Sequence, residues 1–364
     1  MKIAFLGDIA FIGKYDAAQH GIDQVMKRFE KILPVLNGCD YVIANLESPL
    51  TDVRATHEAK TLALRADRIN VEVLTRLGIN AVSLSNNHIF DYGKKGYEET
   101  VRTLQDAGIS YYGIGNNVYT IEKGKTNVRF GGYCCLTANG WHYDIHSNKG
   151  TLNTLSKQNL EAFIKQCERD KCFPIISPHW GEENTHYPRL EHLKLADHLC
   201  EKVNIAFVGH HPHVVQGIKE YKNGSIAAFS LGNFCFDDNE SDTGSGVSVK
   251  QTEENLKGVI LILEIQERSI MSSEAVTYYD GDTGLVVSDQ VKNELLLYSD
   301  AISSNIDAEV FKQTRSDEIK AAHSQRLGNR DMTWLVGHMN SKAVRAVLQR
   351  KKNQKVFQQI SLDF

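Results

Sequence analysis

Three histidines fall within four positions of the segment GHHPHVVQG, residues 209–217, directly after an apolar run. Imidazoles this dense at the end of an expected strand suit a divalent metal of the Mn, Fe or Zn type. Pro212 disfavours the helical region for the residue before it, which predicts an extended His211. In an extended chain, side chains two positions apart face the same side. We therefore expect His211 and His213 to be ligands and His210 to point away in a structural role.

Metal-competent side chains also stand at the ends of the other expected strands. In α/β layer folds, ligands gather beyond the carboxyl ends of the strands, whereas chance would scatter such residues over both edges. The residues found at successive strand ends are Asp8; Asn45 and Glu47; Asn87, His88 and Asp91; His179; and His211 with His213. Their joint occurrence predicts a metal centre at this edge.

Taken singly, these residues have simpler interpretations. Asp8 and Glu47 could each cap a helix or a turn, as acidic residues after strands commonly do. Asn87 fits a turn, and His179 before Trp180 fits a packed core histidine. No other catalytic signature competes, because the sequence has no G-x-S-x-G elbow, Walker loop or H-E-x-x-H motif.

The elements that must position these residues alternate along the first 215 residues between β-rich runs and amphipathic helical stretches. This alternation predicts an α/β layer structure with helices packed on sheets. Strands are expected at 2–7, 40–45, 81–85, 110–113, 128–136, 172–177 and 205–209, and helices at 22–33, 67–77, 96–107, 155–169 and 188–201. From about 225 to 288 the β-rich runs follow one another without intervening helices. This pattern predicts a second sheet packed on the first.

The C-terminal part has a different character. Residues 290–364 look helical, and no acidic residue occurs between Asp331 and Asp363. The cations in this stretch are Lys342, Arg345, Arg350, Lys351, Lys352 and Lys355. One interpretation is a docked helix with a solvated basic face, and the other is binding to a polyanion or an acidic membrane surface. The polar, Gly- and Ser-rich segment 237–248 is expected to be a mobile loop.

Composition is that of an ordinary globular protein. The chain has 364 residues, 41% hydrophobic and 24% charged, with a net charge of −4 that gives no reason to expect nucleic acid. The N-terminal apolar run is short and interrupted by Asp8, unlike a signal peptide or a spanning helix, so we expect a cytoplasmic protein without a transmembrane anchor. The seven cysteines are odd in number and form no CxxC pair, which predicts reduced core cysteines.

Together, six segments resemble the calcineurin-like metallophosphatase superfamily and, within it, the CapA-type poly-γ-glutamate and capsule synthesis family. They are GDIAF (7–11), NLESPLT (45–51), SNNHIFDYG (85–93), PHWGEE (178–183), GHHPHVVQG (209–217) and SLGNFCFD (230–237). The resemblance covers residues 1 to about 240, with weaker support to 288. It implies a four-layer αββα sandwich of two mixed sheets flanked by helices. We expect a catalytic domain at 1–288 and a helical extension at 289–364.

The resemblance also implies a centre of one or two divalent metal ions. Its ligands would be Asp8 and His213 for the first metal, Glu47 as the bridge, and Asn87, His179 and His211 for the second. His88 would be the general acid, and Asp91 three residues on would orient its ring and hold it protonated. Where the superfamily opens with D-x-H, this sequence has Ala10, so the first metal loses a histidine. Glu183 or Asn45 are candidates to compensate.

The predicted function is a metal-dependent hydrolase of a phosphoester or a related polar bond, with a role in capsule or poly-γ-glutamate synthesis implied by the resemblance. Its substrate would be a small molecule or a polymer. Site-shaping or substrate contacts are expected from Asn45, Trp180, Glu183 and Asn233, although Asn233 also fits a packing turn. The alternatives are a non-catalytic, metal-containing assembly or binding subunit, and a hydrolase or transferase of γ-glutamyl amide bonds. The C-terminal helices are candidates for a homo-oligomer contact.

Overall fold

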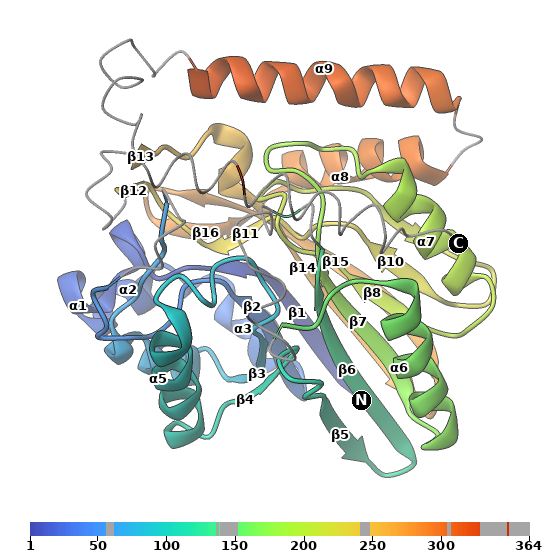
Figure 1. Cartoon of the computed structure of the whole chain (residues 1–364), viewed down its shortest axis with the longest axis horizontal. Coiled ribbons are helices and arrows are strands. Elements are labelled where there is room, and N and C mark those ends of the chain that lie inside the picture. Colours follow the sequence, from blue (N-terminus) through green and yellow to red (C-terminus); the bar gives the residue numbers. More distant parts are fainter. Residues whose placement is uncertain are drawn as a thin grey trace.

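A computed structural model describes residues 1–55, 62–135, 138, 152–240, 248–303, 307–327 and 348 of the chain. Two β-sheets lie face to face in this part of the protein, with helices on their outer sides (Figure 1). The basic segment 342–355 falls outside the described residues except for Leu348, and the expected loop 237–248 is described only at its two ends.

The first sheet is mixed and carries the N-terminal strand near its middle. Its order is β16-β15-β14-β1-β2-β3-β4, and β11 pairs with the end of β1. Strands β1 to β4 run parallel, and β14 to β16 are antiparallel additions. The strands are β1 (Lys2–Ile9), β2 (Tyr41–Leu46), β3 (Ile79–Ser83), β4 (Ser110–Tyr112), β11 (Asn233–Cys235), β14 (Lys257–Gln266), β15 (Ser269–Gly281) and β16 (Gly284–Val287).

The second sheet has a parallel centre and antiparallel edges, in the order β5-β6-β7-β8-β10-β9. Its strands are β5 (Tyr119–Lys123), β6 (Thr126–Cys134), β7 (Phe173–His179), β8 (Ala206–Val208), β9 (Ile218–Glu220) and β10 (Ile226–Ala228). A short pair, β12 (Asn239–Glu240) with β13 (Ser248–Val249), stands apart from both sheets.

Alternation along the strands builds three apolar layers. On β1, Ile3 and Phe5 face the core between the sheets, whereas Ala4 and Leu6 face a helical layer. On β8 of the other sheet, Ala206 faces the same central core and Phe207 faces the opposite helical layer. Because both sheets bury both faces, the predicted four-layer sandwich is confirmed.

Helices from the two halves of the chain cover different faces. The helices of the first layer are α1 (Ala17–His20), α2 (Ile22–Lys27), α3 (Leu33–Asn37), α4 (Val71–Arg76) and α5 (Gly93–Asp106). Those of the second layer are α6 (Lys157–Arg169) and α7 (Leu190–Cys200), joined by side chains of α8 (Asp289–Ser303) and α9 (Ala308–Leu327). Helix α8 also inserts Val291 and Leu295 into the core between the sheets. The domain boundary at 288 stays a prediction.

Two structural expectations need correction. The strands from 257 to 287 do not form the second sheet; they extend the first sheet beside β1. The continuous apolar run of β14 suits this place, because a strand covered on both faces needs no polar alternation. The helix expected at 22–33 is split into α2, which ends at Lys27, and α3, which begins at Leu33. Pro34 lies in the first turn of α3, where its missing N–H costs no helical hydrogen bond.

The seven cysteines all lie in the described part of the chain, where they form no disulfide, and six of them are buried. Within that same part, no helix combines the length and the apolar character that crossing a membrane requires.

Candidate metal centre

The polar residues expected at strand ends gather where the carboxyl ends of strands from both sheets meet. Asp8 is the second-last residue of β1 and Glu47 directly follows β2, whereas His179 ends β7 in the opposite sheet. The loop after β8 begins at Gly209, where an added Cβ would lie 2.0 Å from the carbonyl oxygen of Phe229. Only glycine allows this close approach, which brings the following histidines beside β7.

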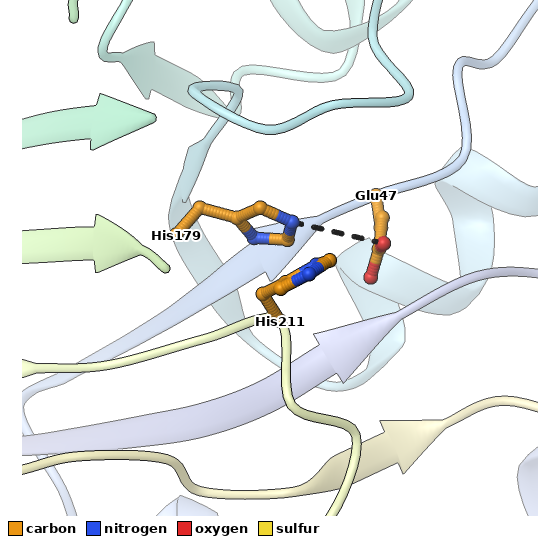
Figure 2. Close-up of side chains that lie close together, drawn as sticks. All are labelled: Glu47, His179 and His211. Atoms are coloured by element: carbon orange, nitrogen blue, oxygen red, sulfur yellow. Dashed lines mark ion pairs between the residues drawn. The ribbon is translucent and has the colours of Figure 1, made fainter. Parts of the chain in front are cut away.

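Two overlapping groups of side chains could each hold a cation. One is Glu47, His179 and His211, and the other is Asp8, Glu47 and His213; within each group the ligand atoms lie within 4.8 Å of one another. Figure 2 shows Glu47, His179 and His211 converging from separate elements. Glu47 belongs to both groups and is fully buried. This is the position a bridging carboxylate needs.

Distances around Glu47 match a cation better than direct hydrogen bonding. Its Oε1 lies 3.8 Å from Nε2 of His179 and 3.6 Å from Nε2 of His213. These separations exceed those of hydrogen bonds. Two ligands of a metal with bonds of about 2.0–2.2 Å lie roughly 3 to 3.5 Å apart, so a small contraction would close each group around an ion. The amide oxygen of Asn87 adds a neutral donor, 2.7 Å from the same Nε2 of His179.

The imidazoles of His179 and His211 are in the protonation state that ligands need. Burial, followed by the neighbouring histidines, lowers the pKa of His179 well below its ordinary value. Burial likewise lowers the pKa of His211 to about 3. Both rings are therefore neutral near pH 7, with a nitrogen lone pair available. The Nδ1 atom of each is buried and has no hydrogen-bond partner among the described residues. The donor set fits one or two divalent metals of the Mn, Fe or Zn type.

Asp8 is a buried carboxylate kept ionised by its contacts. Its Oδ1 accepts a hydrogen bond of 2.9 Å from the Asn45 amide, and its Oδ2 accepts one of 3.0 Å from the backbone N–H of His211. Although burial is the largest influence and would raise the pKa of Asp8, contacts with His210 and His213 and this N–H together lower it. A charged Asp8 is what a metal ligand requires.

The histidine loop differs from the sequence prediction in two ways. His211 is not extended but has a φ of 98°, and His213 has a φ of 59°. Pro212 excludes the right-handed helical region but not this left-handed one. Such backbone costs about 1–3 kcal/mol at a non-glycine residue and is held by surrounding contacts. Here those contacts are the His211 N–H to Asp8 and the Asn184 N–H to the Pro212 carbonyl oxygen, 2.8 Å away.

The second correction concerns His210, which we expected to point away from the site. Its Nδ1 instead lies 3.0 Å from Oδ1 of Asp8, and the residue is 3% exposed. The alternation argument failed because the left-handed residues break the extended chain on which it depends. All three histidines of the loop therefore face the centre.

His88 stands at the rim of the centre with both ring nitrogens in defined surroundings. Its Nδ1 lies 2.7 Å from Oδ2 of Asp91, and its Nε2 lies 3.8 Å from Oε1 of Glu47. The same Asp91 oxygen accepts a hydrogen bond of 2.7 Å from the backbone N–H of Leu64. The ring is thereby oriented with Nε2 toward Glu47.

The four expected substrate contacts lie in different surroundings. Trp180 is 1% exposed and donates its indole N–H to the Phe229 carbonyl oxygen, so it packs in the core beside His179, a place that fits the site-shaping role. Asn45 is fully buried on Asp8. Asn233 is also buried, and its Oδ1 lies 2.9 Å from Nδ1 of His213. Only Glu183 is half-buried and keeps a place at the site's edge.

Position 10 contributes no ligand, as its residue type suggested. Ala10 is fully buried in a small apolar cluster with Ile12, Leu64 and Phe236. The Phe236 ring also packs against His213, with ring centroids 4.9 Å apart. This cluster closes the site beside the Asp8 group.

One set of supporting residues was missed from the sequence. Helix α9 contacts the loop that follows His179, where Arg315 pairs with Glu182. The Nε of Arg315 also donates to the Tyr187 carbonyl oxygen at 3.2 Å. Glu318 accepts from the His186 N–H at 3.1 Å. No sequence signal could have found these pairs, because their partners lie about 130 positions apart.

His192, on α7, was not singled out and predicts a pH effect on stability. It is 1% exposed and stacks on Trp180 with centroids 4.6 Å apart; burial, followed by Arg189, lowers its pKa to about 3. Below about pH 6.5, the pKa of His192 in the unfolded chain, the unfolded chain binds a proton that the folded chain does not bind. The free energy of unfolding therefore falls as the pH falls. Between pH 6.5 and pH 5, we expect the free energy of unfolding to fall by about 2 kcal/mol less in His192→Phe than in the wild type.

The measurement is urea unfolding of the metal-free wild type and variant across that range. Equal slopes of the unfolding free energy against pH in the two proteins would contradict a neutral, buried His192.

Comparison with known proteins gives consistent matches. Residues 2–238 match the model of a family described as "Bacterial capsule synthesis protein PGA_cap". The chain is 26% identical over 246 residues to the PGA biosynthesis protein CapA of Bacillus subtilis (strain 168), covering 65% of this chain and 63% of that protein. It is 31% identical over 236 residues to the capsule biosynthesis protein CapA of Bacillus anthracis, covering 60% and 55% respectively.

A solved structure, that of the calcineurin-like phosphoesterase YfkN from Bacillus subtilis, superposes with a TM-score of 0.44 at 14% identity, over 89% of this chain and 98% of that one. The chain spans less than two thirds of the length of the two CapA relatives. All the candidate ligands, from Asp8 to His213, lie inside the segment matched by the family, whereas β14 to β16, α8 and α9 lie outside it.

Proposed function

Because the chain belongs to the bacterial capsule synthesis protein PGA_cap family, we propose that it is a metal-dependent hydrolase of a phosphoester or a related polar bond in capsule or poly-γ-glutamate synthesis. The observation that carries the chemistry is Glu47, one fully buried carboxylate shared by two groups of potential ligands. Burying a carboxylate among imidazoles is costly unless a charge compensates it, which supports a cation there.

Two divalent cations of the Mn, Fe or Zn type would be held by the two groups, with Asn87 as an added oxygen donor. When bound, such ions polarise a phosphoryl or carbonyl oxygen and lower the pKa of a water toward about 7. Asp8 and Glu47 offset the mutual repulsion of the cations. The neutral imidazoles of His179 and His211 add donors without adding charge.

The protein's own proton donor would be His88. Its Nδ1 on Asp91 leaves Nε2 directed at the centre, where it can hold a proton for the oxygen that leaves. The Leu64 N–H keeps Asp91 in place. Glu183, half-buried beside the histidine loop, is the proposed contact to a polar group of the substrate.

The test is an assay of chelator-treated and Mn²⁺-reloaded protein on aryl phosphates, aryl phosphodiesters and poly-γ-glutamate. We expect turnover of a phosphoester by the loaded protein, its loss on chelation and its return with metal. Cleavage of poly-γ-glutamate alone would move the assignment to a γ-glutamyl amide hydrolase or transferase. Metal binding without turnover of any substrate would contradict the hydrolase proposal.

That last outcome would favour a second candidate function, a metal-containing assembly or binding subunit without catalysis. One observation favours it: Ala10 lies in an apolar cluster, so the Asp8 group has a single imidazole among its potential ligands. Polymer binding measured without turnover would support this function.

A further inference from the structure

The Asp8 end of the centre contains an imidazole that belongs to neither group of potential ligands. The ring of His210 is buried, with Nδ1 3.0 Å from Oδ1 of Asp8. Within the described residues, Oδ1 is contacted by this nitrogen and by the Asn45 amide, whereas Oδ2 accepts the His211 N–H. The two oxygens of Asp8 therefore have separate partners.

The division matters because Oδ2 is the oxygen that lies beside another member of its group. Oδ2 lies 3.5 Å from Nδ1 of His213. A carboxylate can rotate about its terminal bond, whose torsion is broad and roughly two-fold. The hydrogen bond from Asn45 and the close Nδ1 of His210 oppose that rotation at Oδ1 and keep Oδ2 beside His213.

The backbone holds His210 where this contact requires it. Its N–H donates to the Pro178 carbonyl oxygen at 2.9 Å, and its carbonyl oxygen accepts the Trp180 N–H at 3.0 Å. These bonds form a parallel bridge between His210 and His179, a candidate ligand. The position of His210 is thus tied to the end of β7, and only its side-chain torsions remain to be set.

We propose that His210 is a positioning residue of the metal centre: it holds Oδ1 of Asp8 so that Oδ2 stays directed at the cation site formed with Glu47 and His213. The inference rests on the proposed function in one respect, namely that the Asp8 group binds a metal. The apolar cluster around Ala10 supplies no polar side chain, so the side-chain contacts to Oδ1 come from Asn45 and His210. Groups that orient ligands in this way typically contribute 10- to 100-fold to metal affinity.

The test is a titration of the chelator-treated full chain with Mn²⁺. Calorimetry measures the affinity of each site, and electron paramagnetic resonance shows whether the bound ions are coupled. We expect two sites in the wild type, with the spectrum of a coupled Mn²⁺ pair. His210→Ala is expected to weaken one site about 10- to 100-fold and to give the spectrum of a single Mn²⁺ at limiting metal. His210→Asn is expected to restore both, because its amide nitrogen can occupy nearly the place of Nδ1.

His192→Phe is the matched control, since His192 is equally buried but stacks on Trp180 away from Asp8. It is expected to leave both sites unchanged. Wild-type affinities in a folded His210→Ala protein would overturn the inference and leave the proposed function intact. Equal losses of metal affinity in His210→Ala and His210→Asn would also overturn it. The ring of His210 would then contribute through its packing and not through its contact with Asp8. A wild type that binds no Mn²⁺, Zn²⁺ or Fe²⁺ would overturn the metal centre itself.

Discussion

Glu47→Gln is expected to reduce hydrolysis by about a thousandfold and to lower the bound metal below the wild-type content. The substitution keeps the shape of the side chain but removes the charge that both groups of ligands share. Loss of metal polarisation at the reacting oxygen costs several kcal/mol of transition-state stabilisation, and each 1.4 kcal/mol is about a factor of ten in rate. The measurement is kcat/KM on the best phosphoester together with metal analysis of the same preparation.

The matched control is Glu264→Gln, which makes the same chemical change at an exposed position of β14. It is expected to keep wild-type activity and metal content. If Glu47→Gln retained full metal and full activity, Glu47 would not bridge the centre. Loss of activity with unchanged metal would limit Glu47 to a role in substrate chemistry.

His88→Ala is expected to slow hydrolysis in proportion to how much the leaving oxygen needs a proton. Removing a general acid costs about 10²- to 10⁴-fold, and the larger loss belongs to substrates with poor leaving groups, such as alkyl phosphoesters. The acidic phenols of aryl substrates leave with little help from a proton donor, so hydrolysis of these substrates should be affected least. The measurement is kcat/KM of wild type and variant across leaving groups of increasing pKa, where the variant should show the steeper dependence.

Two further variants sharpen this test. Asp91→Asn is expected to produce a smaller loss with the same trend, because Asp91 orients the ring through the 2.7 Å contact but does not touch the substrate. His20→Ala, at an exposed histidine of α1, is expected to have no effect. Full activity of His88→Ala on poor leaving groups would refute the general-acid assignment.

The candidate ligands lie together, as expected from their places at strand ends, because the topology brings those ends to one edge. Once β1, β2, β7 and β8 are strands of facing sheets, their carboxyl ends meet, and the polar residues found there must lie together. Glu47, His179 and His211 approach within ligand distance for this reason. The roles assigned to these residues stay proposals.

The errors came from features that only tertiary contacts decide. His211 was expected to be extended, but it lies in the left-handed region, where its N–H donates to Asp8. His210 faces Asp8, because its backbone pairs with the end of β7. A pattern of alternating residues cannot anticipate a bond between positions 203 residues apart.

Neighbours along the chain were also misleading for Trp180. It follows His179 and was expected to shape the site or touch the substrate; its indole lies in the core, stacked on His192. In the strand β7 and the residue after it, adjacent side chains point to opposite faces, so a residue beside a ligand faces away from the site. The support from Arg315 on α9 was invisible for a related reason, since it joins the site only through folding.

The central claim is that Glu47 is shared by two cation sites at the meeting point of the two sheets. Anomalous diffraction from crystals of the Mn²⁺-saturated protein, measured at the manganese edge, tests it most directly. We expect two peaks, one among Glu47, His179 and His211 and the other among Asp8, Glu47 and His213. Saturated crystals with no peak within bonding distance of Glu47 would contradict it.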